Sequence, residues 1–203
     1  MSTPKAPEKL IRDILTQESL LTVVEPCAIL GVRGYYQDTM GVVGRNDVGQ
    51  YDDAMFFVGP GIFLAANANT DPSRLGWNEA IGKSFAMLLP GLWYFIRGAH
   101  KGKVPALRQA DEDQADDVKI PNHGHFKVWR GKSMDDILTK TARVDDGYHA
   151  INIHRGGEAT TSSWGCQTIP PAQFDNFMEQ VWEHMKKHSM ERIPYLLIDG
   201  PIT

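Results

Sequence analysis

The segment from residue 150 to 167 holds the side chains best suited to covalent chemistry, and it reads AINIHRGGEATTSSWGCQ. On a strand, Asn152 and His154 would share one polar face, because side chains alternate between the two faces. Cys166 follows twelve residues after His154, behind a loop of small residues. A free thiol is only a few per cent ionised at neutral pH and needs a base to become a nucleophile. The pattern predicts Cys166 as nucleophile and His154 as its base.

A turn at the predicted nucleophile would supply the other half of acyl chemistry. Gly165 precedes Cys166 and permits a turn in which neighbouring backbone N–H groups point toward the same position. The N–H groups of Trp164, Gly165 and Cys166 are therefore predicted donors to an oxyanion.

The second nitrogen of the His154 ring needs an acceptor to orient it. A backbone carbonyl in loop 156–163 would serve, and the side chains of Ser163 and Asp53 are alternatives. Against this reading stands the ordinary role of a free cysteine, that of a small buried apolar residue. Spacing alone does not decide between the two, and Cys27, in an apolar run, is expected to be inert.

A family resemblance bears on this choice. Ile153-His154-Arg-Gly followed by Ser163-Trp-Gly-Cys166 resembles a shortened form of the L,D-transpeptidase catalytic signature, a histidine before glycine and a later Ser-x-Gly-Cys-x-Arg. The resemblance implies a β-rich domain whose cysteine attacks peptidoglycan stem peptides and whose acyl group passes to an amine or to water. The order of motifs over residues 29–198 is also similar to a group of uncharacterised phage and prophage proteins, which implies a lysis enzyme or an injected toxin.

The sequence departs from that signature at the substrate-binding arginine. Thr168 occupies its position, and the loop between histidine and cysteine is short. A guanidinium matches carboxylate geometry, so another arginine could replace it. The candidates are Arg155, Arg33 and Arg108, and nearness in sequence favours Arg155. Trp164, beside the nucleophile, is a further predicted substrate contact.

Two other classes of function remain open. His123 and His125 lie on one side of an extended segment and could form a zinc site with His154 and either Asp52 or Asp53. That arrangement would make the chain a zinc-dependent peptidoglycan hydrolase, although no His-Glu-x-x-His helix is present. Alternatively, the aromatic run at 93–95 could belong to a non-catalytic virion-structural or cell-wall-binding protein. The favoured reading requires neither metal nor cofactor.

Hydrophobic periodicity predicts a mainly β protein with flanking helices, an α+β fold with an L,D-transpeptidase-like sheet core. Short apolar runs bounded by glycine and proline predict strands at 27–33, 54–58, 62–66, 92–96, 104–108, 126–129, 150–153 and 195–198. Apolar spacing predicts helices at about 7–17 and 171–188, and Pro170-Pro171 opens the second. The acidic run at 111–117 reads as a solvated loop.

Length and composition limit the remaining possibilities. The 203 residues suggest a single domain, with a helical segment at 1–20 and a catalytic core at 27–203. The net charge of −4 argues against nucleic acid as a partner. The polar N-terminus lacks the apolar region of a signal peptide, and the apolar stretch at 85–96 is too short to span a bilayer. We therefore expect cytoplasmic synthesis and action at the cell wall after release or delivery, in an unknown oligomeric state.

Overall fold

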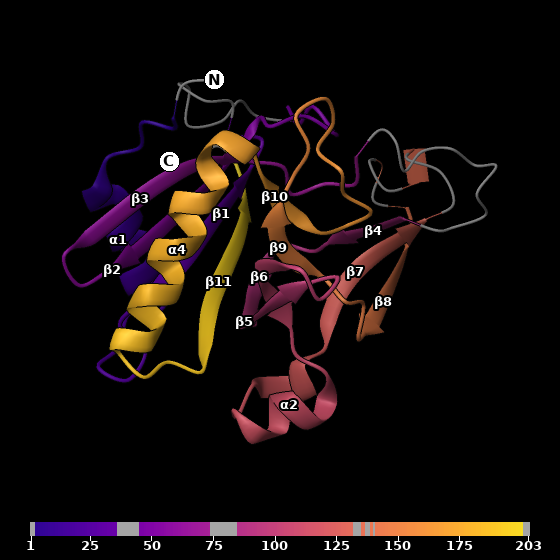
Figure 1. Cartoon of the computed structure of the whole chain (residues 1–203). Helices are drawn as coiled ribbons and strands as arrows, with labels where there is room; N and C mark the ends of the chain where they lie inside the picture. Colours follow the sequence, from indigo (N-terminus) through magenta and orange to yellow (C-terminus); the bar gives the residue numbers. More distant parts are fainter. Residues whose placement is uncertain are drawn as a thin grey trace.

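The fold is mainly β with a few helices, as expected (Figure 1). The computed structural model describes residues 3–35, 45–73, 85–131, 135–136, 139 and 141–200. In these ranges, eight strands form one sheet in the order β10-β9-β6-β5-β11-β1-β2-β3. Its strands are β1 (Ala28–Arg33), β2 (Asp53–Gly59), β3 (Ile62–Ala68), β5 (Gly91–His100), β6 (Val104–Gln109), β9 (Asn152–Arg155), β10 (Gln167–Ile169) and β11 (Arg192–Asp199).

The large sheet is nearly closed. Its two edge strands are β10 and β3, and Asn69, directly after β3, pairs with Thr168 of β10. Both N–H groups in this bridge donate to the other residue's carbonyl, each over 2.8 Å between nitrogen and oxygen. The bridge fixes the short strand β10 on both sides, because β9 already holds its other edge.

The main core lies on the inner face of this sheet, defined by Phe57, Phe95 and Ile153. Helix α4 (Pro171–Lys187) packs there through its apolar stripe, which confirms the helix predicted at 171–188. The stripe forms because its members recur every three or four residues and so share one side of the helix. It consists of Phe174, Phe177, Met178, Val181 and Met185.

Two further elements cover the sheet. Helix α1 (Glu8–Gln17) packs on the outer face of β1 and β2 through Ile11 and Leu15, as the spacing at 7–17 predicted. A smaller sheet, in the order β4 (Phe85–Leu88), β7 (Phe126–Gly131) and β8 (Arg143–Gly147), adds Phe126 to the main core. In Figure 1 it lies beside the large sheet, on the opposite side from α1.

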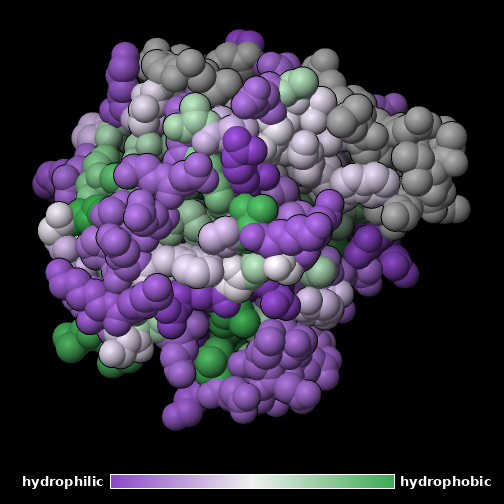
Figure 2. All heavy atoms as spheres, in the orientation of Figure 1, coloured by the Kyte–Doolittle hydropathy of each residue, from purple (hydrophilic) through white to green (hydrophobic). Residues whose placement is uncertain are grey.

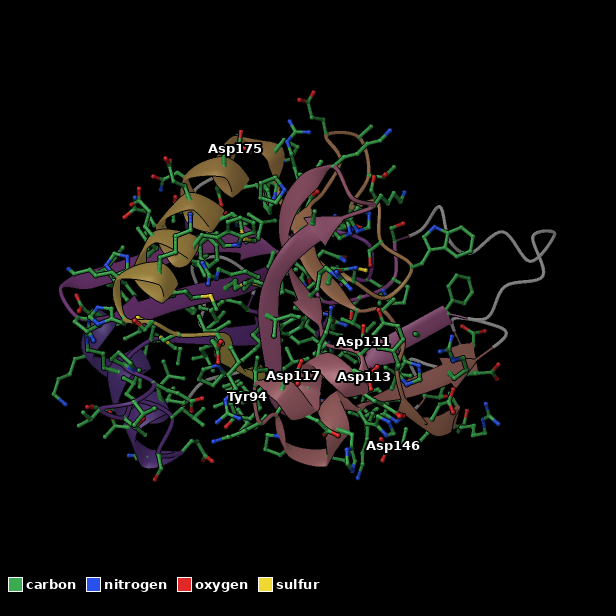
Figure 3. All side chains as sticks on the ribbon, turned by 60° about the horizontal axis from the view of Figure 1, so that its bottom comes forward. Tyr94, Asp111, Asp113, Asp117, Asp146 and Asp175 are labelled. Carbon is green, nitrogen blue, oxygen red and sulfur yellow. The ribbon has the colours of Figure 1, made fainter. Side chains whose placement is uncertain are left out.

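The acidic run is a helix, contrary to the predicted loop. Helix α2 (Glu112–Asp117) begins with a capping box, in which the Asp111 carboxylate accepts from the Gln114 N–H and the Gln114 side chain accepts from the Asp111 N–H. Ala115 is buried against Ile120, the residue directly before the short 3-10 helix η3 (Pro121–Gly124). Figure 3 shows three of its aspartates, Asp111, Asp113 and Asp117, gathered around this short helix. The capping pattern and one apolar contact therefore outweigh the charge density.

The surface shown in Figure 2 is hydrophilic over α2 and along the outward side of α4. None of the helices in the described ranges has the length and apolar content needed to span a bilayer.

Removing the ring at the centre of the α4 stripe should destabilise the fold. Phe177 is 2% exposed and packs edge-on against Phe57, with ring centroids 6.3 Å apart. We expect Phe177→Ala to lower the free energy of unfolding by about 3–5 kcal/mol, because it removes apolar burial and leaves a cavity. Urea denaturation followed by circular dichroism measures the change. The exposed neighbour Glu179→Ala is the control, and an equal loss in both variants would contradict this account.

Candidate active site

Two parallel strands bring Cys166 and His154 onto the same face. In the register of β9 and β10, Thr168 lies opposite His154 and Gln167 opposite Ile153. Cys166, one residue earlier, therefore lies beside Asn152, on the outer face that also carries His154. Strand spacing and rise put the Cα atoms of Cys166 and His154 about 8 Å apart. The predicted pair thus occupies diagonal positions on adjacent strands.

The thiol of Cys166 contacts Asn152 directly. The Asn152 amide Nδ2 donates to Sγ over 3.9 Å, and Sγ lies 3.9 Å from the carbonyl oxygen of Ala150, to which it donates. Burial raises the pKa of the Cys166 thiol, while two Asn152 donors, the backbone N–H and the side-chain amide, and the charge of Lys101 lower it. No hydrogen bond joins Sγ to the His154 ring within the described residues. The thiol is therefore protonated at rest, in contact with donors that would stabilise a thiolate.

The His154 imidazole is a buried neutral base with a fixed orientation. It is 4% exposed, and its Nδ1 lies 2.7 Å from the carbonyl oxygen of Arg155. A carbonyl only accepts, so Nδ1 carries the proton and Nε2 has a free lone pair. Burial, then the nearby His100 and Lys101, lower the pKa of His154 to about 4. The acceptor is a backbone carbonyl, but it belongs to Arg155 of β9 and not to the predicted loop 156–163.

The two side chains proposed as alternative acceptors have other roles. Ser163 donates from Oγ to the Cys166 carbonyl over 2.6 Å and accepts the Gly165 N–H over 3.0 Å. Asp53 accepts the N–H groups of Gly34 and Thr70. Neither carboxylate nor hydroxyl therefore orients His154, because a hydrogen bond to the Arg155 carbonyl already does so.

The turn before Cys166 is built around a glycine and a serine. Gly165 has φ +140°, and a Cβ there would clash with the carbonyl oxygen of Ala86. The Gly165 N–H is bonded to Ser163, which corrects its predicted role as an oxyanion donor. The Cys166 N–H has no acceptor among the described residues. The Cys166 N–H therefore remains a candidate donor to an oxyanion.

A buried polar network supports this turn from the inner face. Gln167, directly after Cys166, donates to the Gly165 carbonyl over 3.2 Å and accepts from the Tyr195 hydroxyl over 3.1 Å. On the same side of the sheet, Arg33 bonds the Thr70 hydroxyl and carbonyl and pairs with Asp71 at 3.1 Å. The sequence pattern did not single out Gln167 as an anchor, since polar residues in strands are usually exposed.

Arg33 is not placed to bind substrate. Its side chain is 3% exposed, and it lies on the inner face, opposite to that of Cys166. Arg155 is exposed, but it pairs with Ile169, so its side chain leaves the sheet on the inner face as well. Nearness in sequence does not put Arg155 on the face of Cys166, because neighbouring strand residues point in opposite directions.

Arg108 is the predicted arginine on the correct face. It lies directly opposite Asn152 in the β6–β9 pair, is half-buried, and rests its side-chain stem over Gly98. Trp164 is 41% exposed on the turn beside Cys166, a position open to a substrate. These two are the substrate-binding candidates that the geometry supports.

The residues of the zinc alternative do not come together. His123 pairs with Asp116 at 2.8 Å and His125 with Glu112 at 3.0 Å, both beside helix α2, whereas His154 is buried against His100. Among the described residues, no group of three His, Cys, Asp or Glu side chains could hold a metal ion. The second cysteine, Cys27, is free and buried, and burial raises its pKa to about 11.

Comparisons with models of protein families, with curated proteins and with solved structures found no match to this chain.

The buried carboxylate of Asp52 should make stability depend on pH. Burial, with the nearby Asp71 and Asp47, raises the pKa of Asp52 to about 7. The folded state then binds the proton more tightly than the unfolded state, so stability falls as pH rises from about 4 to 7. We expect Asp52→Asn to be more stable than the wild type at pH 8 by up to about 4 kcal/mol, given ~1.4 kcal/mol per pKa unit.

Urea denaturation at pH 4 and pH 8 tests this expectation. The difference between Asp52→Asn and the wild type should shrink at pH 4, where both side chains are neutral. Asp175→Asn, at an exposed position of α4, is the matched control and should change stability little at either pH. A destabilised Asp52→Asn protein at pH 8 would overturn the assignment.

Proposed function

We propose that this protein is a cysteine-dependent acyl-transfer enzyme that acts on amide bonds of bacterial peptidoglycan stem peptides. One observation carries the proposal: the half-buried Cys166 thiol, beside two Asn152 donors, shares a sheet face with an oriented, neutral His154. The substrate class rests on the resemblance of the His154 and Cys166 segments to L,D-transpeptidases.

The first step moves one proton and forms one bond. His154 Nε2 accepts the Cys166 thiol proton as Sγ attacks the amide carbonyl carbon. Rotation of the thiol toward His154 must accompany substrate binding, since Sγ contacts Asn152 at rest. Catalytic hydrogen bonds commonly tighten only in the substrate complex. The Asn152 donors stabilise the thiolate in passing.

The second step releases an amine and leaves a thioester. The Cys166 N–H donates to the oxyanion. As the carbon–nitrogen bond breaks, the proton on His154 passes to the leaving nitrogen. Water or a second amine then attacks the thioester, gives its proton to His154, and restores the thiol. The acceptor decides whether the enzyme hydrolyses or cross-links.

Positive charge on the same face suits a substrate that carries carboxylates. Arg108 projects from that face, and Lys101 acts on the pKa of both Cys166 and His154. Stem peptides are rich in carboxylates, so these cations would attract and orient them.

Removal of the thiol should abolish turnover without unfolding the protein. We expect Cys166→Ala to lower the turnover of peptidoglycan tetrapeptides by at least ~10³-fold, because a covalent step loses its nucleophile. Mass spectrometry of muropeptide products measures turnover, and a thermal melt checks the fold. Cys27→Ala is the matched control and should keep turnover.

The alternatives give different outcomes in the same assay. Full turnover by Cys166→Ala would refute the proposal. Loss of turnover when the wild type is treated with a chelator would favour the zinc hydrolase. Intact muropeptides with retained binding to cell walls in the wild type would favour the structural protein.

Loss of the outer-face guanidinium should weaken substrate binding. We expect Arg108→Gln to lower kcat/KM about 10–100-fold, mainly through KM, because a charge-assisted hydrogen bond to a carboxylate contributes about 1.5–3 kcal/mol. Arg108→Lys should recover part of this loss. Arg143→Gln, an exposed arginine of β8, is the control. Unchanged KM in Arg108→Gln would exclude a role for Arg108 in binding.

A further inference from the structure

We propose that His100 is a positioning residue that holds the His154 ring in place by stacking on its face, an inference that rests on the proposed function. The sequence pattern gives His100 no role, because His154 lies 54 residues further along the chain. The two rings lie 3.9 Å apart between centroids, with 14° between their planes.

A small residue of the intervening strand lies between the two histidines. His100 ends β5 and lies on the outer face, as does His154 of β9, and β6 runs between their strands. At the crossing point β6 presents Ala106, whose partner on β5 is Gly98. A larger side chain at Ala106 would crowd the two rings, whereas the space over Gly98 is filled by the stem of Arg108. The β5–β6 pairing thus fixes the position of His100 relative to β6, the strand that separates it from β9.

Two constraints together define the orientation of His154. The Arg155 carbonyl holds Nδ1 and fixes the tautomer, but a single hydrogen bond leaves the ring free to tilt. The flat face of His100 removes that freedom. His100 itself is not held by Nδ1, which is buried without a hydrogen-bond partner in the described part of the chain. A buried nitrogen without a hydrogen bond costs free energy. We infer that the contact between the His100 and His154 rings offsets this cost.

The groups that face the stack are neutral or positive. Lys101 follows His100 in the β5–β6 turn and lowers the pKa of both His100 and His154, and the Cys166 thiol lies on the same face of the sheet. Because the surroundings already carry positive charge, protonation of either histidine ring is unfavourable. A proton taken from the thiol therefore leaves His154 readily, which suits its transfer to the departing amine.

Four variants test the positioning role. His100→Ala removes the stack, His100→Phe keeps a flat buried ring without a charge, His154→Gln removes the base, and His123→Gln is an exposed control. Two readouts are needed, neither of which requires turnover. Nitrogen-15 NMR of the imidazoles gives the tautomer and titration midpoint of His154, and iodoacetamide gives the alkylation rate of Cys166 against pH.

In the wild type, we expect His154 to carry its proton on Nδ1 and to stay neutral down to about pH 4. In His100→Ala, its midpoint should rise by at least one pH unit, and alkylation at pH 7 should slow about tenfold, because misplaced reacting groups cost rate. His100→Phe should stay within about threefold of the wild-type rate, since stacking is kept. His123→Gln should match the wild type.

Several outcomes overturn the inference. An unchanged His154 midpoint and alkylation rate in His100→Ala would do so, as would a slower rate with an unmoved pH profile, which marks a merely structural role. If His100→Ala does not fold, a tenfold loss in His100→Phe alone would also contradict stacking as the cause. Equal alkylation in His154→Gln and the wild type refutes the proposed function instead, and the NMR midpoints then still decide on His100.

Discussion

The parallel pairing of β9 with β10 is the constraint on which the candidate site depends. Strand β10 is three residues long, yet it is held by β9 on one side and by the Asn69 bridge on the other. This double pairing fixes the register that places Cys166 beside Asn152 and Thr168 beside His154. A shift by one residue would turn Cys166 to the inner face, because side chains alternate.

The alternation also joins two different environments through one dipeptide. Cys166 faces outward, toward Asn152, whereas Gln167 faces inward, toward Tyr195 and the Gly165 carbonyl. The inner side is dry and charged, with Arg33 committed to buried partners. A buried network on the inner face therefore anchors the turn that carries the half-buried Cys166 on the outer face.

Burial sets the electrostatic character of the site. It raises the pKa of the Cys166 thiol and lowers that of His154, so both groups are neutral at rest. An ion pair between thiolate and imidazolium is therefore not preformed. Under the proposed function, the proton would move only when substrate and the Asn152 donors stabilise the sulfur, which limits side reactions of a free thiolate.

The sequence by itself determined the features that depend on local periodicity. The apolar spacing defined α1 and α4, the glycine-bounded apolar runs defined most strands of the large sheet, and alternation placed Asn152 with His154. Strands β4, β8 and β10 were not predicted. Strand β8 is rich in charge and β10 is only three residues long, so neither gives an apolar run that marks a strand.

Only the tertiary structure decided which side chains lie on the face of Cys166 and His154. The sheet register places Arg108, but not Arg155, on the face of Cys166, and Arg33 is buried in the core. The His100 ring stacks on the His154 ring. The physical reason is the same in each case. A side chain's type and periodicity are local properties, but the face it meets depends on contacts between strands that are distant in sequence.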